Sequence, residues 1–106
     1  MKRVFVASPY AGEIERNVSY AYAALYHTLS RGEAGFAPHL LYPNVLNDSV
    51  AHDRELGIKA GMSFLTTCDT LALYVDHGIS SGMQQEIELA KSLGINMEER
   101  RLFSDE

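Results

Sequence analysis

The 106-residue sequence contains one cysteine, no tryptophan and only three prolines. The single cysteine, Cys68, excludes an internal disulfide and any zinc site with two or more cysteine ligands. Every hydrophobic run is far shorter than the roughly 18 residues that a membrane-spanning helix needs. The residues after Met1 resemble a strand rather than a signal-peptide core, so we expect a cytoplasmic protein without a membrane partner.

Basic residues are scarce as well, because nine Lys and Arg accompany fourteen Asp and Glu, giving a net charge of −5 at pH 7. Without a basic run, we expect no binding to a nucleic-acid polymer. The composition, 46% hydrophobic and 22% charged, is that of an ordinary globular protein, and the length predicts one domain over residues 1–106. Because such a chain buries only a small core, we expect a homodimer or a larger homo-oligomer.

Short apolar runs alternate with longer segments of helical periodicity, which is typical of an α/β protein. The pattern predicts strands at residues 4–7, 39–42 and 71–75, helices at 13–30, 53–67 and 81–93, and a short edge strand in the tail from residue 95. Leu56, Ala60, Phe64 and Leu65 are expected on the buried side of the second helix. We therefore predict a three-layer, Rossmann- or flavodoxin-like fold with a mostly parallel sheet of four or five strands and helices on both faces. Ligands bind to such sheets at the carboxyl ends of the strands.

Glu86 breaks the pattern of the third predicted helix, because a helical wheel places it among the apolar residues that face the sheet. A buried carboxylate is costly unless it is paired or has a chemical role. One interpretation is a carboxylate satisfied by neighbouring backbone or by an arginine. The other is a nucleophile or general base at the carboxyl ends of the strands.

Two loops at the same end of the sheet offer backbone N–H groups to a ligand. Ser80, Ser81 and Gly82 open the third helix, where free amides and the helix dipole favour an anion such as phosphate. Ser80 or Ser81 can instead simply cap the helix. The loop at residues 8–12 follows the first strand and adds the phenol of Tyr10.

Arg54, in the second predicted helix, lies near the same end of the sheet. It serves either as a cation for a ligand or as the partner of a neighbouring carboxylate in an ion pair. The candidate partners are Asp53, Glu55 and Glu86. The histidines show no spacing of two histidines and a carboxylate on one element, so we expect no metal site, and we expect no cofactor.

These residues together resemble the nucleoside 2-deoxyribosyltransferase-like superfamily, which includes 2'-deoxynucleoside 5'-monophosphate N-hydrolases and small, often phage-borne, uncharacterised domains. The resemblance extends from residues 4–12 to residues 94–95 and is most specific at residues 68–74 and 80–87. It implies that Glu86 attacks the anomeric carbon of a nucleoside and forms a glycosyl-enzyme intermediate. It also implies that Tyr10 holds this carboxylate or the sugar.

Two further positions bear on the chemistry that the resemblance implies. Ser80 falls at a position that is acidic in the transferases and Ser in the monophosphate hydrolases, which favours a 5'-phosphorylated ligand. The family's general acid, an Asp, would fall on Gly61. The proton for the leaving base must then come from another group or from water. The candidate groups are Asp76, Asp53 and a histidine such as His39.

We therefore predict an N-glycosidase or deoxyribosyltransferase-like enzyme that cleaves or exchanges the N-glycosidic bond of a (deoxy)nucleoside 5'-phosphate. The alternative is a protein without catalytic activity that captures a nucleotide or an ADP-ribose-derived signal molecule in the same pocket. The predicted catalytic residues are Glu86, Tyr10 and Asp76. The predicted ligand-binding residues are Ser8, Pro9, Gly12, Asn17, His39, Arg54, Ser80, Ser81 and Gly82.

Overall fold

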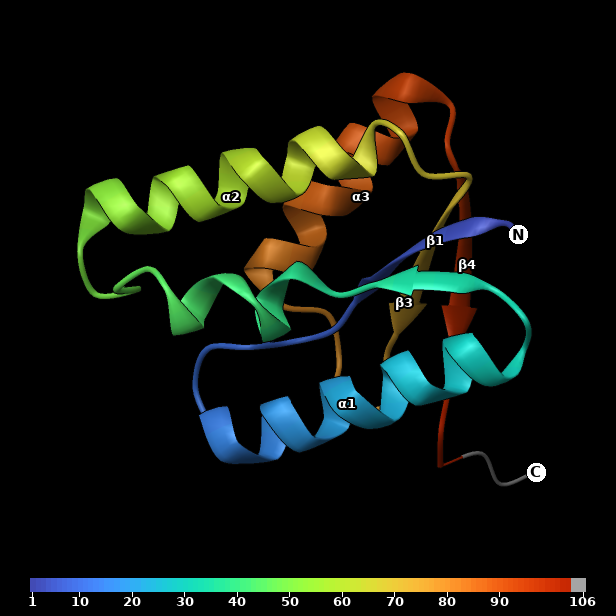
Figure 1. Cartoon of the computed structure of the whole chain (residues 1–106), viewed down its shortest axis with the longest axis horizontal. Coiled ribbons are helices and arrows are strands. Elements are labelled where there is room, and N and C mark those ends of the chain that lie inside the picture. Colours follow the sequence, from blue (N-terminus) through green and yellow to red (C-terminus); the bar gives the residue numbers. More distant parts are fainter. Residues whose placement is uncertain (104–106) are drawn as a thin grey trace.

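The computed structural model describes residues 1–103, which form a four-stranded parallel sheet with helices on both faces (Figure 1). The strands are β1 (Arg3–Ala7), β2 (Ala34–Phe36), β3 (Thr70–Tyr74) and β4 (Asn96–Arg100). They are arranged in the order β2-β1-β3-β4, and all three neighbouring pairs are parallel. This is the flavodoxin-like order, so the predicted α/β fold is confirmed.

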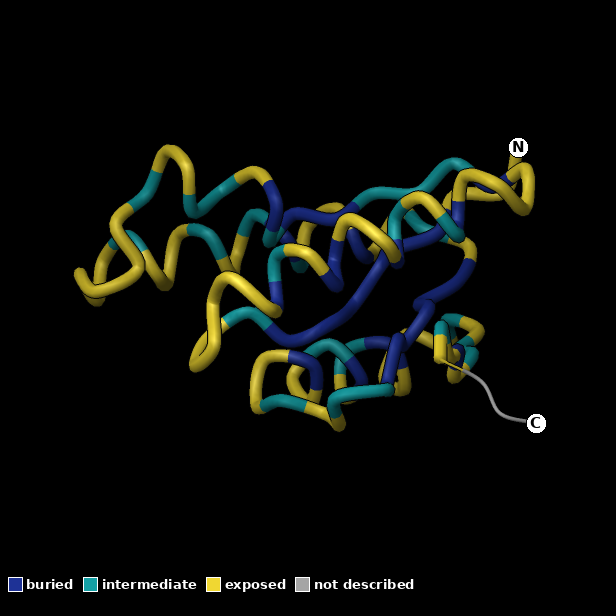
Figure 2. The backbone as a smooth tube through the Cα atoms, turned by 90° about the horizontal axis from the view of Figure 1, so that it is seen from below, coloured by how far each residue is buried: buried dark blue, intermediate teal, exposed yellow. Residues whose placement is uncertain are grey.

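The sheet is the middle of three layers, with α1 (Ile14–Ser30) on one face and α2 (Ala51–Leu65) and α3 (Ser81–Leu93) on the other. Alternate strand residues supply the two cores, because successive side chains of a strand point to opposite faces. Val4 and Val6 pack against α1, whereas Phe5 and Ala7 pack beneath α2 and α3. Figure 2 shows the buried strands running between helices whose outer sides are exposed.

The strand predicted at residues 39–42 is wrong. Two short 3-10 helices, η1 (Pro38–Leu40) and η2 (Tyr42–Asn44), occupy this segment, and each contains a proline in its first turn. Proline fixes φ and removes a backbone donor, which suits a short helix and disfavours a strand inside a sheet. The second strand is the short segment β2, where a Cβ on Gly35 would lie only 2.9 Å from side-chain carbons of α1.

The expected buried side of α2 is also partly wrong. Leu65 is fully buried, but Leu56 and Phe64 are 49% and 51% exposed, and the ring of Phe64 lies 4.8 Å from that of Phe36. The helix is turned so that Gly57 and Gly61 face a cavity beside the sheet. Among residues 1–103, no helix combines the length and the apolar character that a crossing of the lipid bilayer requires.

The predicted tail strand is present as β4, and it continues through the charged residues up to Arg100. The guanidinium of Arg100 is buried and donates two hydrogen bonds to the carboxylate of Glu33, at 2.9 and 3.0 Å. It also donates to the hydroxyl of Tyr74 at 3.1 Å. This bidentate pair makes a charged residue compatible with the end of an edge strand.

Candidate functional site

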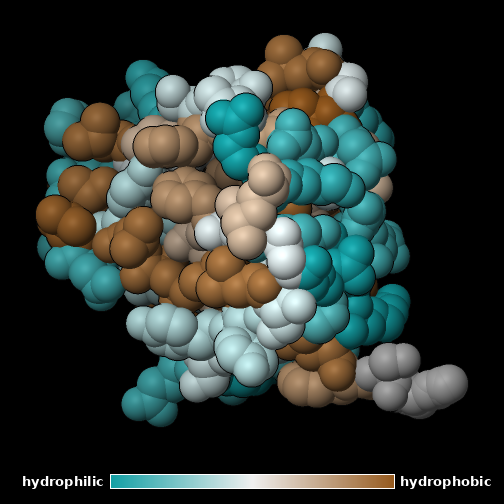
Figure 3. Space-filling model, turned by 45° about the vertical axis from the view of Figure 1, so that its right-hand side comes forward, coloured by the Kyte–Doolittle hydropathy of each residue, from teal (hydrophilic) through white to brown (hydrophobic). Residues whose placement is uncertain are grey.

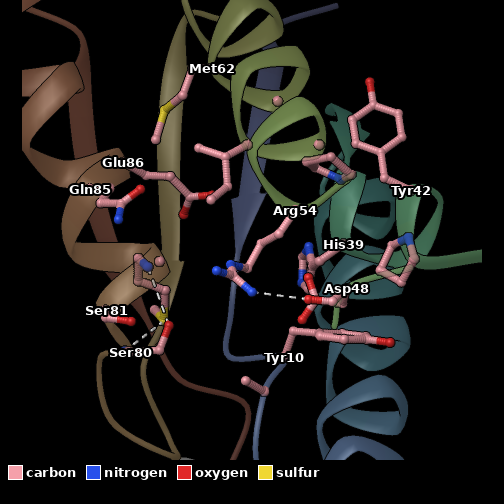
Figure 4. Close-up of a pocket in the computed structure, with 18 of the residues that line it drawn as sticks. Tyr10, His39, Tyr42, Asp48, Arg54, Met62, Ser80, Ser81, Gln85 and Glu86 are labelled. Atoms are coloured by element: carbon pink, nitrogen blue, oxygen red, sulfur yellow. Dashed lines mark hydrogen bonds between the residues drawn. The ribbon is translucent and has the colours of Figure 1, made fainter. Parts of the chain in front are cut away.

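A cavity of about 340 Å³ lies beyond the carboxyl ends of β1 and β3 (Figure 4). Its walls come from the loop after β1, the segment of η1 and η2, one side of α2 and the first turns of α3. The position between β1 and β3 is the point at which the strand order reverses, where open α/β sheets bind their ligands. The volume is within the range of small-molecule sites, roughly 300–1,000 Å³.

The structure brings most of the predicted site residues together at this cavity. Those that line it are Ser8, Tyr10, His39, Arg54, Ser80, Ser81, Gly82 and Glu86. Those that do not line it are Pro9, Gly12, Asn17 and Asp76.

Glu86 is half-buried, and its carboxyl group points into the cavity from the first turns of α3 (Figure 4). Among residues 1–103, no backbone or side-chain group forms a hydrogen bond or an ion pair with this carboxyl. The interpretation of Glu86 as a carboxylate satisfied by its neighbours is therefore wrong for the part of the chain that is described. Burial raises the pKa of Glu86 to about 8, which favours the protonated form at neutral pH.

The first turn of α3 presents backbone N–H groups to the same cavity. Ser80 is the N-cap, and its Oγ accepts a hydrogen bond from the N–H of Met83 at 3.2 Å, so the predicted capping is confirmed. The N–H groups of Ser81 and Gly82 have no acceptor among the described residues. With the positive end of the helix dipole, these amides form an environment that suits an anion.

Arg54 extends from α2 into the cavity, where Figure 4 shows its guanidinium between the first turn of α3 and Asp48. Its Nη1 donates a hydrogen bond to the carbonyl oxygen of Asp48 at 3.2 Å. No ion pair joins Arg54 to a carboxylate of residues 1–103, so the predicted alternative of an ion pair with an acidic neighbour is wrong there. The charge of Arg54 is thus available to a ligand.

His39 and Ser8 form a pair in the wall of the cavity. The Nε2 atom of His39 lies 2.7 Å from the Oγ of Ser8, and Ser8 is only 7% exposed. Burial lowers the pKa of His39 to about 4, which makes the imidazole neutral at pH 7. The sequence indicates both residues but not their contact, because η1 turns His39 toward the loop after β1 and no strand is formed there.

The depressed pKa of His39 predicts a loss of stability in acid. The unfolded chain takes up the proton near pH 6.5 and the folded chain only near pH 4, so the contribution of this histidine falls across that interval. We expect His39→Gln to remove about 2–3 kcal/mol of the decline between pH 6.5 and 4. Urea unfolding at a series of pH values measures this. His52→Gln, at an exposed site, is the control. Parallel profiles of wild type and His39→Gln would contradict the assignment.

Tyr10 lines the cavity, but Figure 4 places its ring at the opposite end from Glu86. No hydrogen bond joins the two side chains in the described residues, so the structure does not show the predicted contact. Asn17 acts on the loop and not on the cavity, because its buried Nδ2 donates to the carbonyl oxygens of Tyr10 and Ala11, both at 3.0 Å. Gly12, with a φ of +97°, makes the turn that leads into α1.

Asp76 does not contribute to the cavity, and its predicted catalytic role is wrong on this geometry. Its carboxylate accepts hydrogen bonds from the hydroxyl of Tyr20 and from the backbone N–H groups of Leu102 and Phe103, the last two at 2.8 and 2.9 Å. Asp76 lies on the α1 side of the sheet because side chains alternate along a strand. Tyr74 faces α1, and Asp76 follows two residues later. Asp76 therefore links residues 102 and 103 to Tyr20 of α1.

The sequence reasoning missed the apolar wall of the cavity. This wall comes from η1, η2, the following loop and α2, and its members are Pro38, Tyr42, Pro43, Leu46, Ile58 and Met62. The two 3-10 helices bring Pro38, Tyr42 and Pro43 opposite α2. Pro38 and Pro43 were the sequence signal against a strand in this segment. Among residues 1–103, no group of three or more His, Cys, Asp or Glu side chains is arranged to hold a metal ion.

Comparison with known proteins gives a family match and two similar structures. A family model described as "Domain of unknown function (DUF7768)" matches residues 2–100, and no curated protein matches the chain significantly. A 2-deoxyribosyltransferase from the psychrotolerant bacterium Bacillus psychrosaccharolyticus has 17% sequence identity and a TM-score of 0.72, over 98% of this chain and 75% of that protein. A 2-deoxyribosyltransferase from Leishmania mexicana has 13% identity and a TM-score of 0.61, over 95% of this chain and 65% of that protein. At these identities the likeness shows the fold.

Proposed function

We propose that this chain, which belongs to the family described as "Domain of unknown function (DUF7768)", cleaves or exchanges the N-glycosidic bond of a (deoxy)nucleoside 5'-phosphate. The observation that carries the proposal is the carboxyl of Glu86, which has no partner among residues 1–103 and points into a cavity at the carboxyl ends of β1 and β3. The fold shared with two 2-deoxyribosyltransferases supports a nucleoside-like ligand for this cavity.

Glu86 acts as the nucleophile in this proposal. One carboxylate oxygen bonds to the anomeric carbon while the C–N bond breaks, which gives a glycosyl-enzyme intermediate. Attack by water on the intermediate completes hydrolysis, and attack by a second base completes exchange. Because the nucleophile must be ionised and burial raises the pKa of Glu86 to about 8, the rate should rise with pH toward that value.

The 5'-phosphate binds at the first turn of α3. The free N–H groups of Ser81 and Gly82 and the guanidinium of Arg54 are the donors. Hydrogen bonds to a charged group are stronger than those between neutral groups, and a helix N-terminus adds the dipole. Ser80 carries no charge, so it does not repel a phosphate.

The sugar occupies the space between the phosphate site and the apolar wall. Ser8 and His39 supply a hydroxyl and an imidazole group to the wall of the cavity, and Tyr10 adds a phenol at the end away from Glu86. Asn17 and Gly12 hold the loop that carries Tyr10, and Pro9 is a buried member of the same loop. These three residues position the ligand-binding groups and do not touch the ligand themselves.

A second candidate function is capture of a nucleotide or an ADP-ribose-derived signal molecule without turnover. The observation that favours it is Gly61, which lines the cavity and leaves no side chain where the related enzymes are expected to hold an acid. A panel of nucleotides separates the two functions. Chromatography detects a released base, and mass spectrometry detects a retained ligand. Retention of an intact ligand without any base release would contradict the enzymatic proposal.

We also propose that the chain forms a homodimer or a larger homo-oligomer. The outer side of α1 exposes Tyr22, Tyr26 and Leu29, which are 58%, 74% and 49% exposed. Figure 3 shows hydrophobic side chains gathered on the left half of one face of the molecule. Such side chains are typical of surfaces that associate. Sedimentation velocity at tens of micromolar should give at least a dimer, and a monomer at that concentration would contradict this proposal.

A further inference from the structure

Among residues 1–103, the wall that α2 contributes to the cavity carries no acidic proton donor near Glu86. Gly57 and Gly61 lie on successive turns of α2 and line the cavity without a side chain. Ile58 and Met62 add apolar groups to this wall, and Figure 4 shows Met62 beside Glu86. A base that departs from the carbon attacked by Glu86 would therefore meet an apolar surface.

The remaining acid and imidazole groups of the cavity are held away from that surface. The Oδ2 atom of Asp53 accepts a hydrogen bond from the N–H of Asn47 at 2.9 Å, so this carboxylate is bound to the loop before α2. Figure 4 places Asp48 near Tyr10, at the far end of the cavity from Glu86. The ring of His39 is neutral because burial lowers its pKa to about 4, and it is bound to Ser8.

Glu86 is the carboxyl group beside the apolar wall, because Asp48 lies at the far end of the cavity and Asp53 is bound to the loop before α2. Arg54, the lining residue with a permanent positive charge among residues 1–103, is the proposed partner of the phosphate. A cation close to Glu86 stabilises the ionised carboxylate, which the nucleophile requires. A neutral base offers no such stabilisation.

We propose that the substrate is a nucleotide whose base is a cationic heteroaromatic ring, such as a pyridinium or an N7-alkylated purine. This inference rests on the proposed function of Glu86 as the nucleophile and names the class of substrate that the same site accepts. It follows from the missing proton donor among residues 1–103, the apolar leaving-group wall and the position of the Glu86 carboxyl beside that wall, where a cationic base would stabilise its ionised form.

The reaction of such a substrate needs no acid. A carboxylate oxygen of Glu86 bonds to the anomeric carbon, and the electron pair of the breaking C–N bond passes to the ring nitrogen. The base leaves as a neutral molecule without taking up a proton. Water then attacks the anomeric carbon, restores the carboxylate and releases one proton to the solvent. Hydrolysis of a neutral nucleotide releases no net proton, because the departing base takes it up.

The test compares nucleotides that differ in the charge of the base. The probes are nicotinamide mononucleotide and 7-methylguanosine 5'-monophosphate as cations, and GMP and dGMP as neutral partners. Chromatography measures base release, a pH indicator in weak buffer measures protons, and Glu86→Gln corrects for spontaneous cleavage. We expect kcat/KM to be at least about a hundredfold higher for the cations, with one proton released per base.

A designed acid at position 61 tests the reason for this preference. A Cβ on Gly61 would lie 3.7 and 3.9 Å from carbons of Pro38, which is ordinary contact, so a substitution there meets no clash at its Cβ. Gly61→Asp should lower the ratio of cationic to neutral kcat/KM at least about tenfold, because the new carboxyl protonates a neutral base. Gly61→Asn has the same shape without the acidic proton and should keep the ratio within about threefold. An equal change of the ratio in both variants would overturn the inference.

The outcomes for the two proposals are distinct. Cleavage of GMP or dGMP as fast as the cationic nucleotides would overturn the substrate class and leave the proposed N-glycosidic activity intact. Binding of these probes without release of any base would overturn the proposed function together with the inference and would indicate capture.

Discussion

Replacing Glu86 with glutamine is expected to lower turnover by at least about a thousandfold, while the affinity for a nucleotide stays within about tenfold. Glutamine keeps the shape of the side chain but cannot attack the anomeric carbon. The carboxylate forms its bond to the sugar only as the reaction proceeds, so its loss affects the transition state more than the bound ground state. Base release measured by chromatography gives turnover, and calorimetry gives the affinity.

Glu88→Gln is the matched control for this variant. Glu88 lies on the same helix two residues further on, is exposed, and its carboxylate accepts a hydrogen bond from the side chain of Gln84. It should keep both turnover and affinity. If Glu86 only captures a ligand, wild type shows no turnover and the variant loses affinity alone. Unchanged turnover and affinity in Glu86→Gln would remove Glu86 from the site.

Glu86→Gln also has a thermal signature that depends on pH. In the folded chain the pKa of Glu86 is about 8, above its ordinary value of 4.5, so ionisation costs stability as the pH rises between these values. The glutamine variant does not pay this cost. Its Tm should therefore match that of wild type near pH 4.5 and exceed it increasingly up to about pH 8, by about 4–8 °C per kcal/mol of relieved destabilisation.

The sequence predicted α3 and its functional residue well because strong local signals define both. Ser80 caps the helix and Gly94 ends it with a φ of +70°, a conformation that glycine adopts easily, so the predicted bounds and the observed ones agree. Glu86 stands among apolar residues in a helix of known bounds, which is enough to place it toward the sheet. The unpaired state of its carboxyl is a property of the assembled cavity, and no local pattern could show it.

The rest of the cavity depends on contacts between elements that are distant in sequence. The rotation of α2 about its own axis decides which of its residues face the cavity. Packing against η1 and α3 sets this rotation, which exposes Leu56 and brings Gly61 to the cavity. The pairing of His39 with Ser8 likewise requires η1, which the sequence pattern presented as a strand. The position of Asp76, in contrast, could have been predicted from the sequence. The alternation of side chains along β3 places Asp76 on the same face as Tyr74.

Removal of the 5'-phosphate from the ligand is expected to weaken binding by about a hundredfold to a thousandfold. A ligand without the phosphate would lose its hydrogen bonds with the N–H groups of Ser81 and Gly82 and with the guanidinium of Arg54. A hydrogen bond to a charged group contributes about 1.5–3 kcal/mol, so two such bonds near the lower value account for a factor of this size. Calorimetry with a nucleotide and the corresponding nucleoside measures the ratio.

Arg54→Gln separates the cation from the helix amides in this measurement. We expect the variant to bind the nucleotide about tenfold more weakly or worse and to bind the nucleoside within about twofold of wild type, because only the phosphate uses the charge. Lys59→Gln, an exposed position on the same helix outside the cavity, should change neither affinity. The preference for the nucleotide should also fall as salt rises, since an exposed charge is screened. A nucleoside that binds wild type as tightly as its 5'-phosphate would show that the first turn of α3 does not bind phosphate.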